Sequence, residues 1–282
     1  MASELIRGFL SRLPAAPGRY EPLVRLGQDR VAGNFYKAQL ASAFQPILGR
    51  DDAIVGHEAF IRSHVDGATE LSPWQLFAEA ASDDELVRLD RLCRTVHAIN
   101  YFAIAPADTR LFLGVETRLL AAVPGEHGRA FERVLTSLGL APRRVVIQLP
   151  AAANRNPVLV GHVIANYRHC GYGVAVTHRP GDPVTLEHTA LFRPDFVRLR
   201  SAEFSDSELR ETVRRVHDAG ALAIVSHVEA AAALAKAREA GADLVQGYHL
   251  GVPQPDAWFD RPFRLPARND DTVALAGAVP LI

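Results

Sequence analysis

One carboxylate and one guanidinium stand close together in a stretch that reads as a pair of strands. Residues 43–62 combine an apolar strand, an Arg-Asp-Asp turn and a second strand that carries Glu58 and Arg62 near its end. A carboxylate can ligate a hard cation such as Mg²⁺, and an arginine pairs well with a phosphate group. The chemistry open to Glu58 therefore depends on which side chains the fold brings beside it.

Strand-like and helical stretches alternate through the rest of the chain. The predicted strands cover residues 110–115, 144–149, 173–177, 196–200, 222–226 and 244–246. Helical patterns cover residues 73–102, with a break expected near Ser82, and then 127–139, 155–170, 207–219 and 229–240. This alternation is typical of a parallel sheet covered by helices, and eight such strands can close into a barrel. In such a barrel the side chains that do chemistry gather at the carboxyl ends of the strands.

Motifs at both ends of this region resemble one protein family. The order Phe-Gln-Pro-Ile from Phe44, followed by Gly-x-Glu-Ala-x-x-Arg ending at Arg62, resembles the opening of an EAL domain. The family is named for a Glu-Ala-Leu tripeptide, which here begins at Glu58 and reads Glu-Ala-Phe. Residues Gln246 to Pro255, Gln-Gly-Tyr-His-Leu-Gly-Val-Pro-Gln-Pro, resemble its closing motif. The resemblance implies an α/β fold, a TIM-barrel-like (β/α)8 barrel of the EAL type, in a bacterial family whose active members hydrolyse the second messenger cyclic di-GMP.

The resemblance also implies a site for two divalent cations, and most of its positions differ in this chain. The family uses an Asn on its third strand, a Glu on its fourth, two Asp on its fifth and a Glu on its seventh, beside the Glu of the tripeptide. Arg198 stands at the family's catalytic lysine, for which a forked, always protonated guanidinium is no equivalent. The other aligned positions are Glu58, Gly114, Gln148, Thr177, His178 and Ser226. Because hard cations need several oxygen ligands, we expect a degenerate site with no metal, no cofactor and no catalytic residues, in a protein that is not an enzyme.

A different metal site is an alternative. His178 and His227 lie at the ends of the fifth and seventh strands, which are neighbouring odd-numbered strands, and could join Glu58 in a two-His-one-carboxylate site for iron or zinc. Alternation along the strand would point His227 away from the lumen, and the chain has eleven histidines from which such a coincidence could arise. We therefore favour the interpretation without a metal.

Nucleotide binding does not require those cations. The resemblance places these residues along the family's ligand groove: Gln45, Glu58, Arg62, Arg198, Glu229, Gln246 and Pro253. Arg62 is the natural phosphate partner, and Arg179 and Arg198 could neutralise a phosphate in place of a cation. The alternative for Gln45 and Gln246 is a structural role as hydrogen-bonding groups of the barrel rim.

Three functions follow, in order of preference. The first is a non-catalytic EAL protein that regulates cyclic di-GMP-related signalling by contacting other proteins, the role the resemblance implies for degenerate members. The second is a metal-independent cyclic di-GMP receptor, and the third is a weak cyclic di-GMP phosphodiesterase. The expected partners are an unidentified protein, cyclic di-GMP and a second copy of the chain in a homodimer.

Composition argues against several other classes. The net charge is −1 and the basic residues are spread along the chain, which is not the pattern of a nucleic-acid-binding surface. The two cysteines, Cys93 and Cys170, lie far apart, and this fits a reducing cytoplasm. No apolar run reaches the roughly 18 residues that a membrane-spanning helix needs.

The chain divides into an N-terminal helical extension at 1–40, an EAL-like barrel domain at 41–258 and a C-terminal tail at 259–282. The extension has one apolar helical face, formed by Leu5, Ile6, Phe9, Leu10 and Leu13. A membrane-surface or partner-docking helix is one interpretation of this face. We favour packing on the protein's own domain, because Pro14 and Pro17 end the segment early.

Overall fold

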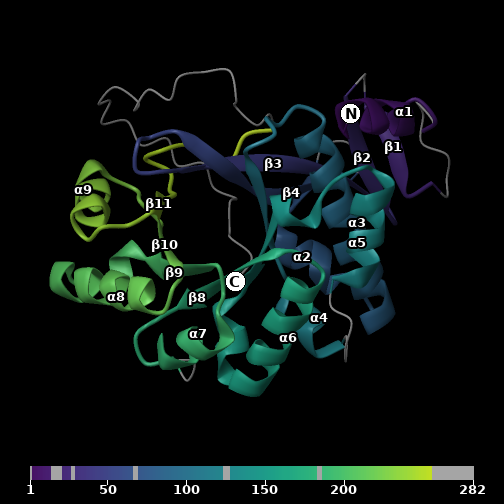
Figure 1. Cartoon of the computed structure of the whole chain (residues 1–282). Coiled ribbons are helices and arrows are strands. Elements are labelled where there is room, and N and C mark those ends of the chain that lie inside the picture. The colour runs from purple at the N-terminus through teal and green to yellow at the C-terminus, as the bar shows by residue number, and fades with distance from the viewer. Residues whose placement is uncertain are drawn as a thin grey trace.

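Eight strands close into a barrel in the computed structural model, which describes residues 2–13, 21–26, 29–65, 69–122, 128–182 and 186–255 (Figure 1). In chain order they are β3 (Ala38–Leu48), β4 (Ile54–Val65), β6 (Arg110–Gly114), β7 (Val145–Leu149), β8 (Gly173–His178), β9 (Phe196–Arg200), β10 (Leu222–Ser226) and β11 (Leu244–Val245). Strand β3 pairs antiparallel with both β4 and β11, and the other neighbours pair in parallel. The predicted α/β, TIM-barrel-like fold is confirmed.

Helices cover the outside of this barrel. They are α2 (Pro73–Ala78), α3 (Asp83–Phe102), α4 (Thr117–Ala122), α5 (Arg129–Ser137), α6 (Pro157–His169), α7 (Leu186–Phe192), α8 (Asp206–Asp218) and α9 (Ala231–Glu239), with short 3₁₀ turns η1 (Pro142–Arg144), η2 (Ala151–Arg155) and η3 (Ser201–Glu203). The break expected near Ser82 is present, because the Ser82 hydroxyl accepts a hydrogen bond from the Glu85 amide and caps α3. No helix in the described part of the chain is both long and apolar enough to cross a membrane.

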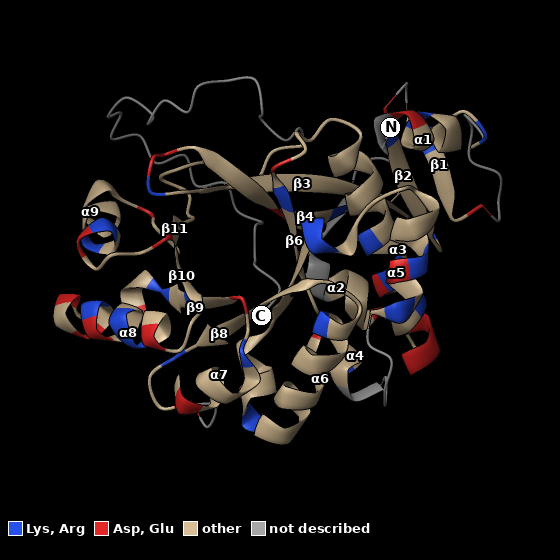
Figure 2. Ribbon diagram, viewed as in Figure 1, with Lys and Arg blue, Asp and Glu red and all other residues tan. Residues whose placement is uncertain are grey.

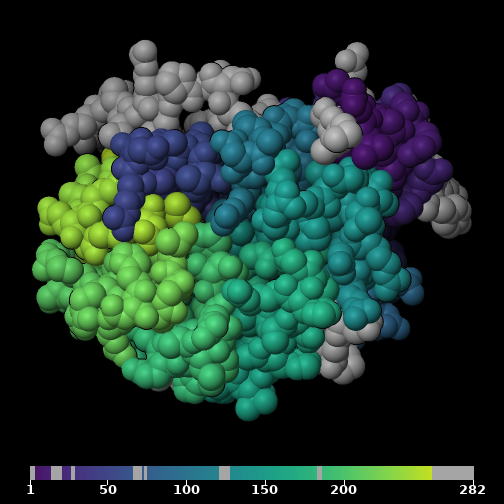
Figure 3. Space-filling view, viewed as in Figure 1, coloured from purple at the N-terminus to yellow at the C-terminus, as the bar shows by residue number. Residues whose placement is uncertain are grey.

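The segment before residue 41 is only partly helical. Helix α1 (Ala2–Leu10) is followed by β1 (Leu23–Leu26) and β2 (Arg30–Phe35), and β2 extends the sheet by pairing antiparallel with β3. Ile6 and Leu10 are buried while Leu5 is exposed, so α1 packs on its own domain as favoured. In Figure 3 these N-terminal elements lie against the helical layer. Short β5 (Thr69–Leu71) adds to the other side, on β4.

One buried side chain ties this N-terminal hairpin to the barrel. Asn100 of α3 accepts a hydrogen bond from the Val31 amide at 2.8 Å and donates to the Val31 carbonyl at 3.0 Å. Its neighbour His97 contacts the Ser42 hydroxyl of β3 at 2.8 Å. The hairpin is therefore attached to the barrel by buried polar contacts as well as by strand pairing. The predicted domain boundaries stay a prediction, and Pro14, Pro17 and the 259–282 tail lie outside the described residues.

The barrel lumen is filled by a layer of apolar side chains. That layer consists of Ile47, Phe112, Val146, Ala175, Phe196, Ile224 and Leu244, with Val55 packed against it. Because side chains two residues apart in a strand face the same way, the residues two places beyond these toward the carboxyl ends of β6 to β11 belong to the next layer. That second layer is where a ligand could enter, and it positions the site described below.

Charged residues are mixed on the outer surface. Figure 2 shows acidic and basic residues interleaved along α8. Within that helix Arg214 pairs with Glu211 and Asp218 at 2.6 and 2.8 Å.

Candidate functional site

A ring of mostly polar residues lies directly above the apolar lumen. Its members, in strand order, are Gln45, Glu58, Gly114, Gln148, Thr177, Arg198, Ser226 and Gln246. Each follows a lumen-filling residue by two places, except Glu58, which follows Gly56, and Gln45, which precedes Ile47 because β3 runs the other way. A Cβ atom on Gly56 would stand 2.3 Å from the Arg110 carbonyl oxygen, so a glycine is required for β4 to approach β6 closely here.

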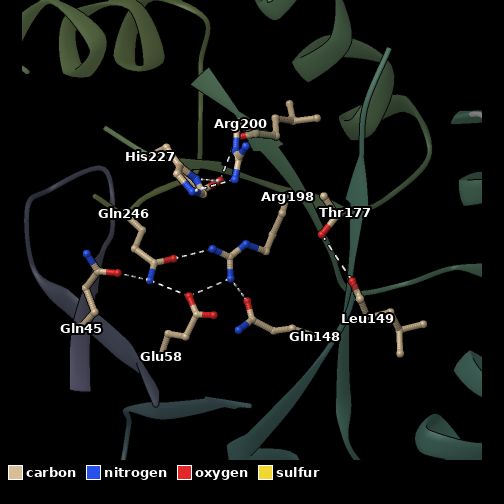
Figure 4. Close-up of polar contacts among 11 residues, drawn as sticks. Gln45, Glu58, Gln148, Leu149, Thr177, Arg198, Arg200, His227 and Gln246 are labelled. Atoms are coloured by element: carbon tan, nitrogen blue, oxygen red, sulfur yellow. Dashed lines mark hydrogen bonds and ion pairs between the residues drawn. The ribbon is translucent and has the colours of Figure 1, made fainter. Parts of the chain in front are cut away.

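Arg198 is the centre of the hydrogen-bond network in this ring (Figure 4). Its guanidinium donates to Glu58 Oε2 at 2.9 Å, to Gln246 Oε1 at 2.8 Å and to Gln148 Oε1. The Gln246 amide nitrogen in turn donates to Glu58 Oε2 at 2.7 Å and to Gln45 Oε1 at 2.9 Å. The Arg198 and Glu58 side chains are 12% and 13% exposed, so this ion pair is largely desolvated. The positive charge that neutralises Glu58 is therefore a side chain of the protein itself, Arg198.

Two adjoining hollows open above the ring, and both are lined by Glu58, Phe60, Arg198 and His227. The first, of about 820 Å³ and open to solvent, continues over β6 to β10. It is also lined by Gly114, Thr177, Arg179, Arg200 and Ser226. The second, of about 610 Å³, lies over β3 and β11. It is also lined by Gln45, Glu229, Gln246, Tyr248 and Pro253. Together they form one groove across the carboxyl ends of the barrel strands.

His227 enters the groove through an uncommon backbone conformation. Its φ of 58° is left-handed, which few residues other than glycine adopt. The expectation that strand alternation would point His227 away from the lumen is therefore wrong, because the strand ends at Ser226 and His227 no longer has the extended conformation on which alternation depends. The His227 imidazole lines both halves of the groove.

The hydrogen bonds of His227 determine which ring nitrogen carries the proton. Arg200 Nη2 lies 3.1 Å from Nε2, and since a guanidinium can only donate, Nε2 accepts. The proton is then on Nδ1, 3.3 Å from the Ser226 hydroxyl, which donates to the Leu199 carbonyl. Burial, together with the charges of Arg200 and Arg198, lowers the pKa of His227 to about 4. The imidazole is neutral at physiological pH.

The structure brings most of the predicted ligand-groove residues together. Gln45, Glu58, Arg198, Glu229, Gln246 and Pro253 all line the groove. Arg62 lines neither half, although its charge acts on nearby Tyr248 and His97. The binding roles of the predicted groove residues stay predictions. The sequence interpretation missed Phe60 and Tyr248, and strand alternation from Glu58 would have identified Phe60.

The residues present do not fit a pair of divalent cations. Gly114 offers no side chain, the Thr177 hydroxyl donates to the Leu149 carbonyl at 3.3 Å, and Glu58 is already paired. His178 lies against Phe204, with ring centroids 6.4 Å apart, and lines neither hollow. Within the described ranges no three His, Cys, Asp or Glu residues gather as a metal site requires.

A family model described as the EAL domain matches residues 28–253. The chain belongs to the EAL domain family. The segments that resemble the opening and closing motifs of that family lie side by side in the barrel, on β3 and β4 and directly after β11. Among curated proteins, an uncharacterized EAL-domain containing protein of Bacillus subtilis, YkuI, is 24% identical over 224 residues, which is 74% of this chain and 54% of that protein. The chain thus spans about half the length of this relative.

Solved structures share the fold at low identity. YkuI from Bacillus subtilis, in complex with substrate c-di-GMP and calcium, matches with a TM-score of 0.66 at 21% identity, over 78% of this chain and 57% of that one. The EAL domain of FimX from Pseudomonas aeruginosa, bound to c-di-GMP, matches with a TM-score of 0.66 at 20% identity, over 77% and 91%. PaMucR phosphodiesterase in complex with c-di-GMP matches with a TM-score of 0.61 at 17% identity, over 77% and 92%.

These matches correct one prediction. The expectation that the protein is not an enzyme is contradicted, because YkuI is described with c-di-GMP as its substrate and PaMucR as a phosphodiesterase. The predicted degeneracy of the metal positions is a separate matter that these matches do not test, and it stays a prediction.

Proposed function

We propose that this EAL protein binds cyclic di-GMP in the groove above the barrel, and that binding does not require a divalent cation. The family membership and the c-di-GMP-bound structures of the same fold support the choice of ligand. The groove also has suitable chemistry for a nucleotide. Phe60 and Tyr248 offer ring surface for the bases, and the polar residues beneath them offer amide groups for sugar and phosphate oxygens.

The observation that carries this proposal is the internal ion pair between Arg198 and Glu58. A carboxylate at the floor of a phosphate-binding groove repels the ligand unless a cation compensates it. Here Arg198 compensates it at 2.9 Å, and the contact is shielded from water. The groove therefore accepts phosphate oxygens without recruiting a metal from solution.

Isothermal titration with cyclic di-GMP, once with Mg²⁺ and once with a chelator, tests the proposal. We expect micromolar or tighter binding that is the same in both conditions. Arg214→Gln on α8 is the control, because it removes an equal charge from an exposed position outside the groove. Absence of heat in both conditions would refute the proposal, and binding that disappears with the chelator would refute its metal independence.

Chromatography of the nucleotide recovered after titration adds a second readout. A linear product would show that the bound ligand is also hydrolysed, as the description of PaMucR as a phosphodiesterase suggests for the family. Action through a protein partner, a homodimer and a cytoplasmic location stay predictions.

A further inference from the structure

Two arginines in the first hollow share a single carboxylate. Arg179 Nε lies 3.4 Å and Arg200 Nη1 lies 3.8 Å from the same oxygen of Glu203. Both distances exceed those of a close charge-assisted hydrogen bond. Two positive charges thus meet one negative charge at long range, which leaves this wall of the groove with an excess of positive charge. We refer to Arg179 and Arg200 as the arginine pair.

Arg198 does not contribute to this excess of positive charge. The sequence interpretation grouped it with Arg179 as a replacement for a cation. In the structure its two terminal nitrogens donate to Glu58, Gln148 and Gln246, and its charge is cancelled by Glu58. Arg200 takes its place beside Arg179, two residues further than Arg198 toward the carboxyl end of β9, and its side chain is 37% exposed.

His227 orients Arg200 without cancelling its charge. The neutral imidazole accepts from Arg200 Nη2 at 3.1 Å, and its own ring is fixed from the other side by the Ser226 hydroxyl. A carboxylate in this position would have neutralised the guanidinium. A neutral acceptor leaves the full charge available and reduces the number of orientations that Arg200 can adopt.

We infer that the arginine pair is a phosphate-binding site that holds the phosphate group directly, on the side of the groove where the family resemblance places metal ligands. A guanidinium presents a planar fork that matches two phosphate oxygens, and two such forks on one wall can neutralise a phosphate without a cation. The phosphate group can come from two sources, free orthophosphate or a phosphodiester of cyclic di-GMP. In the second case the inference rests on the proposed function.

Two titrations distinguish these sources. Sodium phosphate and cyclic di-GMP are each titrated into the full chain in a phosphate-free buffer of low ionic strength containing a chelator. The variants are Arg179→Gln, Arg200→Gln and the control Arg214→Gln. Because each variant loses charge-assisted hydrogen bonds to the phosphate, we expect each arginine-pair variant to weaken phosphate binding roughly tenfold or more, and the control to leave it unchanged.

The outcomes separate this inference from the proposed function. Orthophosphate binding that depends on the arginine pair, with no binding of the nucleotide, supports the site and removes the proposed function. Nucleotide binding that is equal in all variants, without arginine-dependent phosphate binding, overturns the site and leaves the proposed function standing. If the unsubstituted protein binds phosphate and cyclic di-GMP and Arg179→Gln and Arg200→Gln bind neither, the result supports both the phosphate site and the proposed function. No binding of either ligand by the unsubstituted protein overturns both.

His227→Asn tests the orienting role. Asparagine tolerates the left-handed backbone at this position, so the fold is preserved, and its shorter side chain has no acceptor at the position of Nε2, which Arg200 contacts. We expect weaker phosphate binding than in the unsubstituted protein and a smaller loss than in Arg200→Gln. An unchanged affinity would show that Arg200 needs no orienting partner.

Discussion

Replacing Arg198 with methionine tests the idea that this arginine neutralises Glu58 inside the protein. The substitution keeps an unbranched apolar stem of similar length and removes the charged guanidinium group. Glu58, which is 13% exposed, would keep only its bond from Gln246, and Gln148 would lose its donor. Removing one partner of a buried pair typically costs 3–5 kcal/mol, and because the groove admits water we expect the lower end, about 3 kcal/mol.

A double-mutant cycle gives the size of the coupling. Glu58→Gln alone leaves the guanidinium without its counter-charge, whereas the double variant Arg198→Met with Glu58→Gln leaves no charge uncompensated. We therefore expect the double variant to be destabilised by about 2 kcal/mol less than the sum of the two single variants. The free energy of unfolding is measured by urea denaturation. The comparison is valid if all variants have a similar m-value, the slope of the unfolding free energy against urea concentration.

The surface pair on α8 is the matched control. Arg214→Met removes two exposed ion pairs, and such pairs are worth roughly 0–1 kcal/mol. If Arg198→Met costs no more than this control, or if the cycle shows no coupling, then Glu58 does not depend on Arg198 and the argument for metal-independent binding fails.

Three further changes test other parts of the structure. Asn100→Ala removes both hydrogen bonds to the Val31 backbone and leaves two buried groups unpaired, so we expect a loss of about 2–3 kcal/mol in urea denaturation and faster amide exchange in β2; unchanged exchange in β2 would contradict this. Burial lowers the pKa of His97 to about 3, and the charges of Arg62 and Arg94 add to this effect. Between about pH 6.5 and pH 3 this histidine is therefore protonated in the unfolded chain and neutral in the folded protein. The stability that this group contributes is therefore present above pH 6.5 and is lost progressively as the pH falls toward 3, and His97→Gln is expected to flatten the fall in unfolding free energy between pH 7 and 5; an equally steep fall in the variant would refute this. Gly56→Ala places a Cβ atom 2.3 Å from the Arg110 carbonyl oxygen, so β4 must move away from β6; we expect a loss of at least about 2 kcal/mol and weaker nucleotide binding, and native stability would show that β4 can shift freely.

The sequence predicted the barrel because local patterns and long-range motifs agreed. Strands β9 and β10 have the predicted bounds, Phe196–Arg200 and Leu222–Ser226, since each is a short apolar run between a helix end and a turn. The N-terminal hairpin was not predicted. Strand β2 is short, and it is held by Asn100 from a distant helix, a contact that no local pattern can indicate.

The site was predictable in position and only partly in chemistry. Alignment on the family motifs located the ring residues, because the strand register fixes which side chains face the lumen. It could not show that Arg198 reaches Glu58, Gln148 and Gln246 at once, since these come from β4, from β7 and from the residue after β11. It also placed His227 on the wrong side, because a left-handed residue after β10 breaks the alternation on which the prediction relied.

The contacts of Arg198 and the position of His227 together change the electrostatics of the groove. A metal ion is exchangeable, so a groove that depends on one gains and loses its positive charge with the metal concentration. Arg198 and the arginine pair are part of the chain, and guanidinium groups stay protonated at any physiological pH. His227 is also neutral at physiological pH and contributes no variable charge. The positive charge of this groove is therefore fixed by the sequence, which is why we expect its affinity for phosphate groups to respond to ionic strength and not to a chelator.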